Sequence, residues 1–89
     1  MDYQQDDNKF KELLNQEYNW PARYTFKFIL PAGKEKAIEA IFNKEVEIKK
    51  RPSSGGKYTS ITIYATMASA DEIVELYKAT ATISGIISL

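Results

Sequence analysis

The sequence of 89 residues contains no cysteine and no histidine. The absence of cysteine excludes disulfide bonds and thiol nucleophiles, and the absence of both residue types removes most zinc sites. Imidazole acid–base chemistry is also excluded. A catalytic site would have to use Asp, Glu, Lys, Tyr or Ser alone. We therefore expect a protein that is not an enzyme and that has no cofactor and no metal site.

Long apolar segments are missing as well. The chain has no run of eighteen apolar residues, so no membrane-spanning helix is expected. The first ten residues, MDYQQDDNKF, are acidic and polar, whereas a secretory signal begins with basic residues and continues with apolar ones. These features predict a cytoplasmic protein.

The formal net charge is zero, but the charges are unevenly distributed. Residues 21–58 carry nine basic and four acidic side chains, and the segments on both sides are acidic overall. A nucleic-acid-binding domain usually has a net basic character, so only a local basic patch could serve this purpose here. We expect a protein partner or a second copy of the chain rather than nucleic acid.

The length predicts a single domain over residues 1–89. Residues 1–19 are expected to form an accessory helical segment. Asp6 or Asp7 can cap its helix, and Phe10, Leu13 and Leu14 share one helical face. This helix should end near Asn19, because proline disfavours helical conformation in the residue before it.

Residues 22–89 show alternating strand and helix signals. The segment ARYTFKFILP alternates between its two sides, as a half-buried strand does. A helix, KEKAIEAIF, and a short strand, VEIKKRP, follow. The turn SSGG leads into a long strand ending at Met67. Ser69 and Glu72 form a capping box that starts a second helix, and IISL is a last short strand.

This order, a helix followed by β-α-β-β-α-β, predicts an α+β fold. Right-handed crossovers place both long helices on one face of a four-stranded antiparallel sheet, which is the ferredoxin-like plait. The first and third strands would be central. The predicted core is Tyr24, Phe26, Phe28, Ile38, Ile41, Phe42, Val46, Ile48, Ile61, Ile63, Ile73, Val74, Leu76 and Tyr77.

The other face of the predicted sheet is left open. Its side chains are Arg23, Thr25, Lys27, Glu47, Lys49, Tyr58, Ser60, Thr62 and Tyr64. Because tyrosine and arginine are enriched in protein interfaces, a docking or self-association surface is the main hypothesis. A merely solvated sheet face explains the same residues through their strand propensity.

Two alternatives remain open. RNA-recognition modules use this plait, but Gly56-Lys57-Tyr58-Thr59-Ser60 matches their third-strand signature only in part. Tyr58 and Tyr64 would also stand roughly 20 Å apart along one strand, too far apart for neighbouring bases. A small-molecule sensor of the ACT type would use the loop after the first strand, here Pro31-Ala32-Gly33.

Three segments, NWPARYTFKFILP, GGKYTSITIYATM and ISGIISL, resemble the YbeD-like family of small bacterial proteins over residues 8–89. The resemblance implies an ACT-like, ferredoxin-like fold, a cytoplasmic bacterial setting and a regulatory binding role. It supplies no catalytic residues. It draws attention to Gly56, Lys57, Tyr58 and Ser60, which match the family's third strand. The candidate binding residues are Lys27, Lys57, Tyr58, Ser60 and Tyr64.

Overall fold

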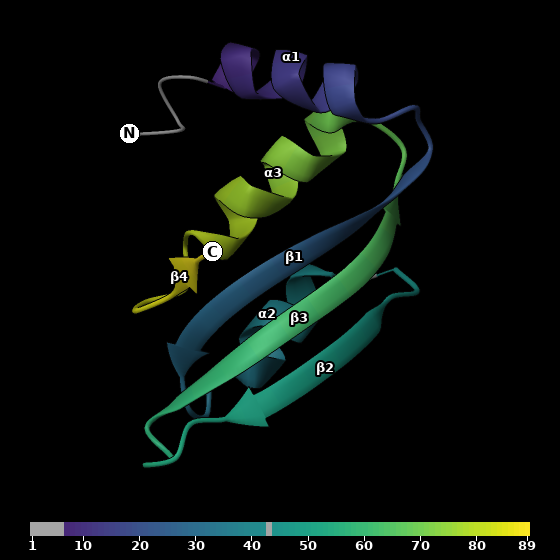
Figure 1. Cartoon of the computed structure of the whole chain (residues 1–89). Helices are drawn as coiled ribbons and strands as arrows, with labels where there is room; N and C mark the ends of the chain where they lie inside the picture. Colours follow the sequence, from purple (N-terminus) through teal and green to yellow (C-terminus); the bar gives the residue numbers. More distant parts are fainter. Residues whose placement is uncertain (1–6, 43) are drawn as a thin grey trace.

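The structure of the chain is a computed structural model that describes residues 7–42 and 44–89 (Figure 1). Its elements are α1 (Asp7–Glu17), β1 (Ala22–Pro31), α2 (Glu35–Ile41), β2 (Glu47–Pro52), β3 (Tyr58–Met67), α3 (Ala70–Thr80) and β4 (Ile87–Ser88). The order confirms the predicted α+β class and the helix that precedes the plait.

The four strands form one antiparallel sheet in the order β2-β3-β1-β4. The two long strands, β1 and β3, are therefore central, as predicted. Their register pairs Phe26 with Ile63 and Phe28 with Ile61, so the apolar positions of both strands point to the same side. Figure 1 shows α2 behind β1 and β3. The buried side chains of α2 and α3 join those of the strands in one core, and this arrangement confirms the ferredoxin-like plait.

Aromatic rings dominate the core between the sheet and the helices. Phe26 and Phe28 are completely buried, and Phe42 is nearly so. The ring of Phe42 meets that of Phe26 edge-on at 5.0 Å between centroids, a favoured aromatic geometry. Eight predicted core residues are buried: Phe26, Phe28, Ile38, Phe42, Ile61, Ile63, Ile73 and Val74.

Six other predicted core residues are only half-buried and pack against the periphery of the core: Tyr24, Ile41, Val46, Ile48, Leu76 and Tyr77. Their place in the core is therefore confirmed in part, because they pack against the buried cluster while each keeps some exposed surface. The structure adds to the core the apolar residues Leu14, Leu30, Ala65, Met67 and Ala70.

Local sequence signals determine the ends of α3 and of the β2–β3 hairpin. The backbone N–H of Glu72 donates to Ser69 Oγ at 3.2 Å, which is the predicted N-cap. The Glu72 carboxylate accepts from the backbone N–H of Ala68 at 2.7 Å rather than from Ser69 itself. In the hairpin turn, Gly56 has a φ of +73°, a conformation that glycine adopts without steric cost.

Helix α1 lies across α3 (Figure 1). Leu14 is 5% exposed there, and ion pairs of 2.9 Å join Lys11 to Asp71 and Asp7 to Lys78. The predicted helix is confirmed, although it ends at Glu17 rather than near residue 19. The alternative cap, Asp6, lies outside the described residues. Within the described ranges, the helices are too short and too polar to cross a bilayer.

Candidate functional site: the open face of the sheet

One side of the sheet is not covered by α2 or α3, and we call it the open face. It consists of the alternate strand positions that point away from the core. These are Arg23, Thr25, Lys27 and Ile29 of β1, Glu47, Lys49 and Arg51 of β2, Tyr58, Ser60, Thr62, Tyr64 and Thr66 of β3, and Ile87 of β4.

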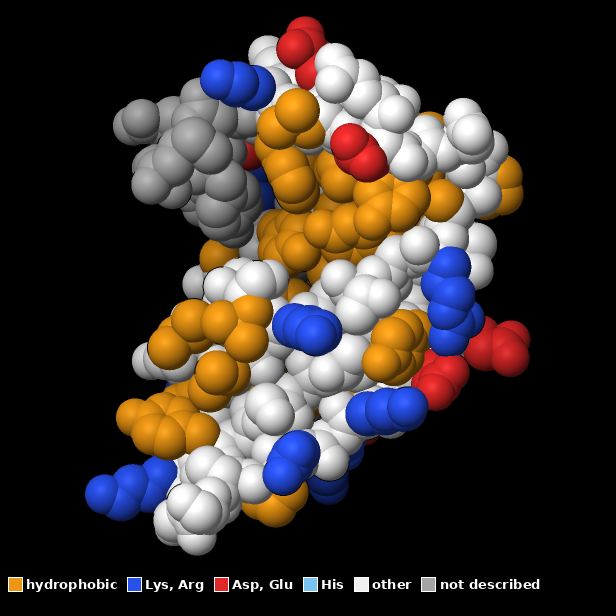
Figure 2. Space-filling view, in the orientation of Figure 1, with side chains coloured by type: hydrophobic (Ala, Val, Ile, Leu, Met, Phe, Trp, Pro, Cys, Tyr) orange, Lys and Arg blue, Asp and Glu red, His pale blue; other side chains and the backbone are white. Residues whose placement is uncertain are grey.

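The open face is basic. Its described charged residues are four cations, Arg23, Lys27, Lys49 and Arg51, and one acid, Glu47. The neighbouring Lys50 belongs to the other side, where its Nζ lies 2.7 Å from a carboxylate oxygen of Glu39. Figure 2 shows basic side chains spread over the strands, with acidic ones at one margin of the sheet and over α1. A chain of zero net charge thus has a cationic surface.

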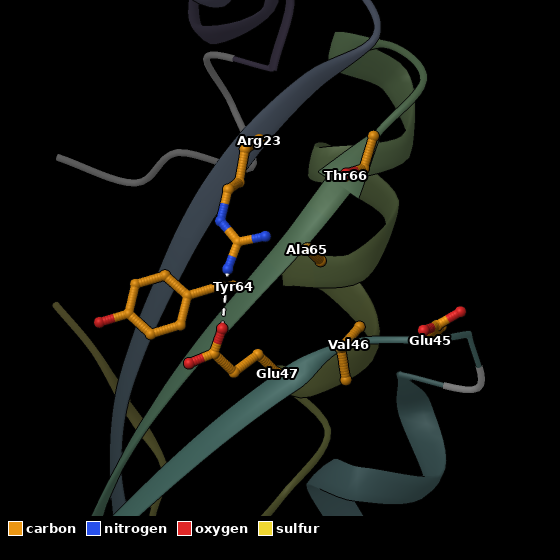
Figure 3. Close-up of a pocket in the computed structure, with 7 residues that line it drawn as sticks. All are labelled: Arg23, Glu45, Val46, Glu47, Tyr64, Ala65 and Thr66. Carbon is orange, nitrogen blue, oxygen red and sulfur yellow. Dashed lines mark hydrogen bonds and ion pairs between the residues drawn. The ribbon is translucent and has the colours of Figure 1, made fainter.

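Tyr64 lies near one end of this face, between two cations. The guanidinium of Arg23 is 5.3 Å from the centroid of the Tyr64 ring, and the Lys49 ammonium is 5.6 Å from it. Both distances permit a cation–π interaction. Arg23 also forms an ion pair of 3.0 Å with Glu47 (Figure 3). Three of these residues, Arg23, Glu47 and Tyr64, line a shallow pocket of about 420 Å³ together with Glu45, Val46, Ala65 and Thr66.

Tyr58 lies at the opposite end and is 49% exposed. It lines a second shallow pocket of about 430 Å³. The other residues around this pocket are Ile29, Arg51, Pro52, Ser53, Ser54 and Ser60. Arg51, Ser60 and Ile29 lie side by side in the sheet register. The pocket therefore combines apolar surface, three hydroxyl groups and one guanidinium beside an exposed aromatic ring.

Four of the predicted binding residues lie on the open face: Lys27, Tyr58, Ser60 and Tyr64, with the two tyrosines at opposite ends. Lys57, the fifth candidate, precedes β3 in the turn, where its carbonyl accepts from the backbone N–H of Ala32 at 2.9 Å. The list of candidates omitted Arg23, Lys49 and Arg51. Strand alternation had already placed Arg23 and Lys49 on the outward side, and it could have placed Arg51 there as well. Their proximity to the tyrosines depends on the register of three strands.

The loop after β1, the alternative sensor site, is occupied by a side chain of the protein itself. Glu35 accepts from the Gly33 backbone N–H at 2.8 Å and from the Thr59 hydroxyl at 2.6 Å. The hydrogen bond from Thr59, followed by those from backbone amides, holds the pKa of Glu35 below its ordinary value. The described residues contain no cluster of three acids that could hold a metal ion.

The chain is similar to a protein family and to a ribosomal protein. The model of the family described as "Protein of unknown function (DUF493)" matches residues 15–88. The chain is also 42% identical over 74 residues to "Large ribosomal subunit protein uL23" of Fusobacterium nucleatum subsp. nucleatum. That alignment covers 75% of this chain and 73% of the relative. No solved structure matches.

Proposed function

We propose that this chain, which belongs to the DUF493 family of proteins of unknown function, is a non-enzymatic protein that binds single-stranded RNA through its open face. Membership of this family confirms the resemblance seen in the sequence. The observation that carries the proposal is the excess of four cations over one acid on the open face. Because the whole chain has no net charge, this excess reflects where the charges are placed.

The chemistry of the face suits RNA. Lysine and arginine can neutralise phosphates, and exposed aromatic rings can stack on unpaired bases. The serine and threonine hydroxyls between them both donate and accept hydrogen bonds. The ribosomal relative adds support, because its name places it in an assembly that contains RNA. The RNA alternative therefore has more support than the sequence alone provided.

We propose no catalytic role for this protein, for a chemical reason. The chain has no cysteine or histidine. The two glutamates with lowered pKa values, Glu35 and Glu72, accept hydrogen bonds that organise loops of the fold. Neither belongs to the open face. We keep a cytoplasmic location as part of the proposal. The ACT-like sensor has less support, since the backbone N–H of Gly33, in the loop after β1, already donates a hydrogen bond to Glu35.

Self-association, the main hypothesis from the sequence, is a second candidate, and the β4 edge favours it. Ile87 is 53% exposed and Leu89 is 69% exposed. Residues 79–89 carry no charged side chain, whereas the opposite edge, β2, carries Lys49, Lys50 and Arg51. Charged residues discourage pairing between sheet edges. If β4 pairs with a second copy, sedimentation velocity should show a dimer that Ile87→Lys converts to monomer.

The RNA proposal is tested by the fluorescence anisotropy of labelled oligoadenylate at several salt concentrations. For a single strand, log K falls with log[salt] with a slope of about −0.7 per phosphate contact, so four contacts predict a slope of about −3. The variant Lys27→Gln/Arg51→Gln should reduce the steepness of this slope by about 1.4. The matched control Lys9→Gln/Lys36→Gln removes two exposed lysines from the helices and should leave it unchanged.

Acidic peptide is the decisive competitor. Polyglutamate presents negative charge without bases, so it should displace the oligonucleotide only weakly if RNA is the partner. If polyglutamate binds and the oligonucleotide does not, the open face is a protein-docking surface and the RNA proposal fails. Equal losses of binding in the open-face and control variants would also contradict it, because such binding would follow total charge.

A further inference from the structure

The two tyrosines of the open face differ in what covers their rings. Tyr64 is half-buried, and its ring has Arg23 and Lys49 within cation–π distance. Tyr58 is 49% exposed and borders the pocket of about 430 Å³. A base that stacked on Tyr64 would have to displace these cations, whereas a base can approach Tyr58 directly.

The pocket beside Tyr58 has apolar surface where a flat ring would lie. Ile29 is apolar, but it faces outward and is only half-buried. Its register partner on β4, Ile87, extends the apolar surface toward the sheet edge. Pro52 lines the pocket from β2. An aromatic ring next to aliphatic side chains provides a stacking surface for a planar base, and every base has such a π-face.

Polar groups lie around this apolar surface. Ser53, Ser54 and Ser60 line the pocket with hydroxyls that can pair with the polar edge of a base. Arg51 brings a guanidinium, which recognises phosphate better than an ammonium does because of its planar set of donors.

The backbone holds this end of the face in place. Ser53 N–H donates to the Tyr58 carbonyl at 2.8 Å, and Tyr58 N–H donates to Ser53 Oγ at 3.2 Å. Gly56 N–H donates to the Ser53 carbonyl at 3.0 Å. Because these bonds involve the backbone of Tyr58 and not its ring, we expect that the side chain can be changed without loss of the turn.

We propose that the pocket of Tyr58, Ile29, Arg51 and Ser60 is a nucleobase site, in which one unpaired base of RNA stacks on Tyr58 and the adjoining phosphate pairs with Arg51. Tyr64 has a different role and positions Arg23 and Lys49 for phosphates farther along the strand. This inference rests on the proposed RNA-binding function and assigns base contact to one tyrosine and phosphate contact to the surroundings of the other.

The test compares Tyr58→Ala, Tyr58→Phe and Arg51→Gln by anisotropy, with an oligoadenylate and with an abasic oligomer of equal length. Tyr58→Ala should weaken oligoadenylate binding roughly five- to 150-fold, as expected for the loss of one stacked base, without changing the salt slope. Tyr58→Phe should retain affinity, because stacking needs the ring and not the hydroxyl. Arg51→Gln should reduce the steepness of the slope by about 0.7.

The abasic oligomer separates the two proposals. The unchanged protein should bind the abasic oligomer more weakly than it binds oligoadenylate. The Tyr58→Ala variant and the unchanged protein should have equal affinities for the abasic oligomer. If oligoadenylate binds but Tyr58→Ala keeps its full affinity, the base site is wrong and RNA binding by the face stands. If the unchanged protein binds neither oligomer, the proposed function itself fails. A thermal melt of each variant shows whether the fold is retained. Independently, adenosine monophosphate should shift the methyl NMR signals of Ile29 if the pocket binds a base.

Discussion

The two faces of the sheet are made by the same strands but have opposite chemistry. On the covered face, Phe26, Phe28, Ile61 and Ile63 are completely buried. On the open face, the alternate positions of the same strands hold mainly cations, hydroxyls and tyrosines that are exposed or half-buried. Substitution on the covered face should therefore cost stability, whereas substitution on the open face should change binding and leave the fold intact.

The largest effect is expected for Phe26→Ala. Phe26 is completely buried and contacts several aromatic rings, including those of Phe28 and Phe42. Its truncation should lower the free energy of unfolding by about 3–5 kcal/mol through lost burial and a residual cavity. Chemical denaturation measures this, with Thr25→Ala on the opposite face of the same strand as control. A loss below about 1 kcal/mol for Phe26→Ala would remove it from the core.

The next effect concerns acid pH. A hydrogen bond from the Ala68 backbone N–H, with support from Lys44, holds the pKa of Glu72 below its ordinary value, and Thr59 does the same for Glu35. A carboxyl whose pKa is lowered in the folded state stabilises the protein above its unfolded pKa. That stability should be lost as the pH falls from about 4.5 through the lower folded values.

Urea unfolding midpoints measured between neutral pH and about pH 3 should show this loss. The variant Glu35→Gln/Glu72→Gln should have a flatter dependence on pH, because it lacks both carboxyls. Glu12→Gln, on the exposed surface of α1, should behave like the unchanged protein. Identical pH profiles for all three proteins would mean that these hydrogen bonds do not favour the charged carboxylates.

A smaller effect is expected for the ion pair on the open face. Arg23 and Glu47 meet at 3.0 Å with side chains that are 59% and 55% exposed. Solvent-exposed pairs contribute about 0.2–1 kcal/mol. A double-mutant cycle with Arg23→Gln and Glu47→Gln should give a coupling in this range that decreases with salt. A salt-independent coupling above about 2 kcal/mol would show that water does not screen this end of the face.

The smallest effect on stability is expected for Tyr58→Ala. This residue is 49% exposed, and surface substitutions usually change the free energy of unfolding by less than about 0.5 kcal/mol. Thermal and chemical unfolding should therefore be nearly unchanged, even where RNA binding is weakened. If Tyr58→Ala unfolds the protein while Thr59→Ala does not, the two faces of β3 have been exchanged in our description.

Much of the fold could be predicted because its signals are local. Alternation in residues 22–31 separates Phe26 and Phe28 from Lys27 without knowledge of any other strand. The Ser69 cap and the Gly56 turn likewise depend on neighbours within a few residues. Burial of Leu14 was missed because it requires the docking of α1 on α3, which a single amphipathic pattern does not specify.

The candidate site could be predicted only in part, for the same reason. Tyr58, Ser60 and Tyr64 follow from the alternation of one strand. The cation–π contacts of Tyr64 unite residues from β1, β2 and β3. Such contacts depend on strand order and register, so the sequence pattern identified the face but not the different surroundings of its two tyrosines.

The sequence by itself thus determined the elements, their buried sides and the outward position of most open-face residues, since these follow from periods of two and 3.6 residues along the chain. Only the tertiary structure decided which outward residues become neighbours. Pairing of β1 and β2 with β3 places Arg23, Lys49 and Glu47 around Tyr64. It also places Ile29 and Arg51 beside Ser60, next to the exposed ring of Tyr58. Long-range pairing of strands creates these two environments, because no local pattern records the distance between residues on different strands.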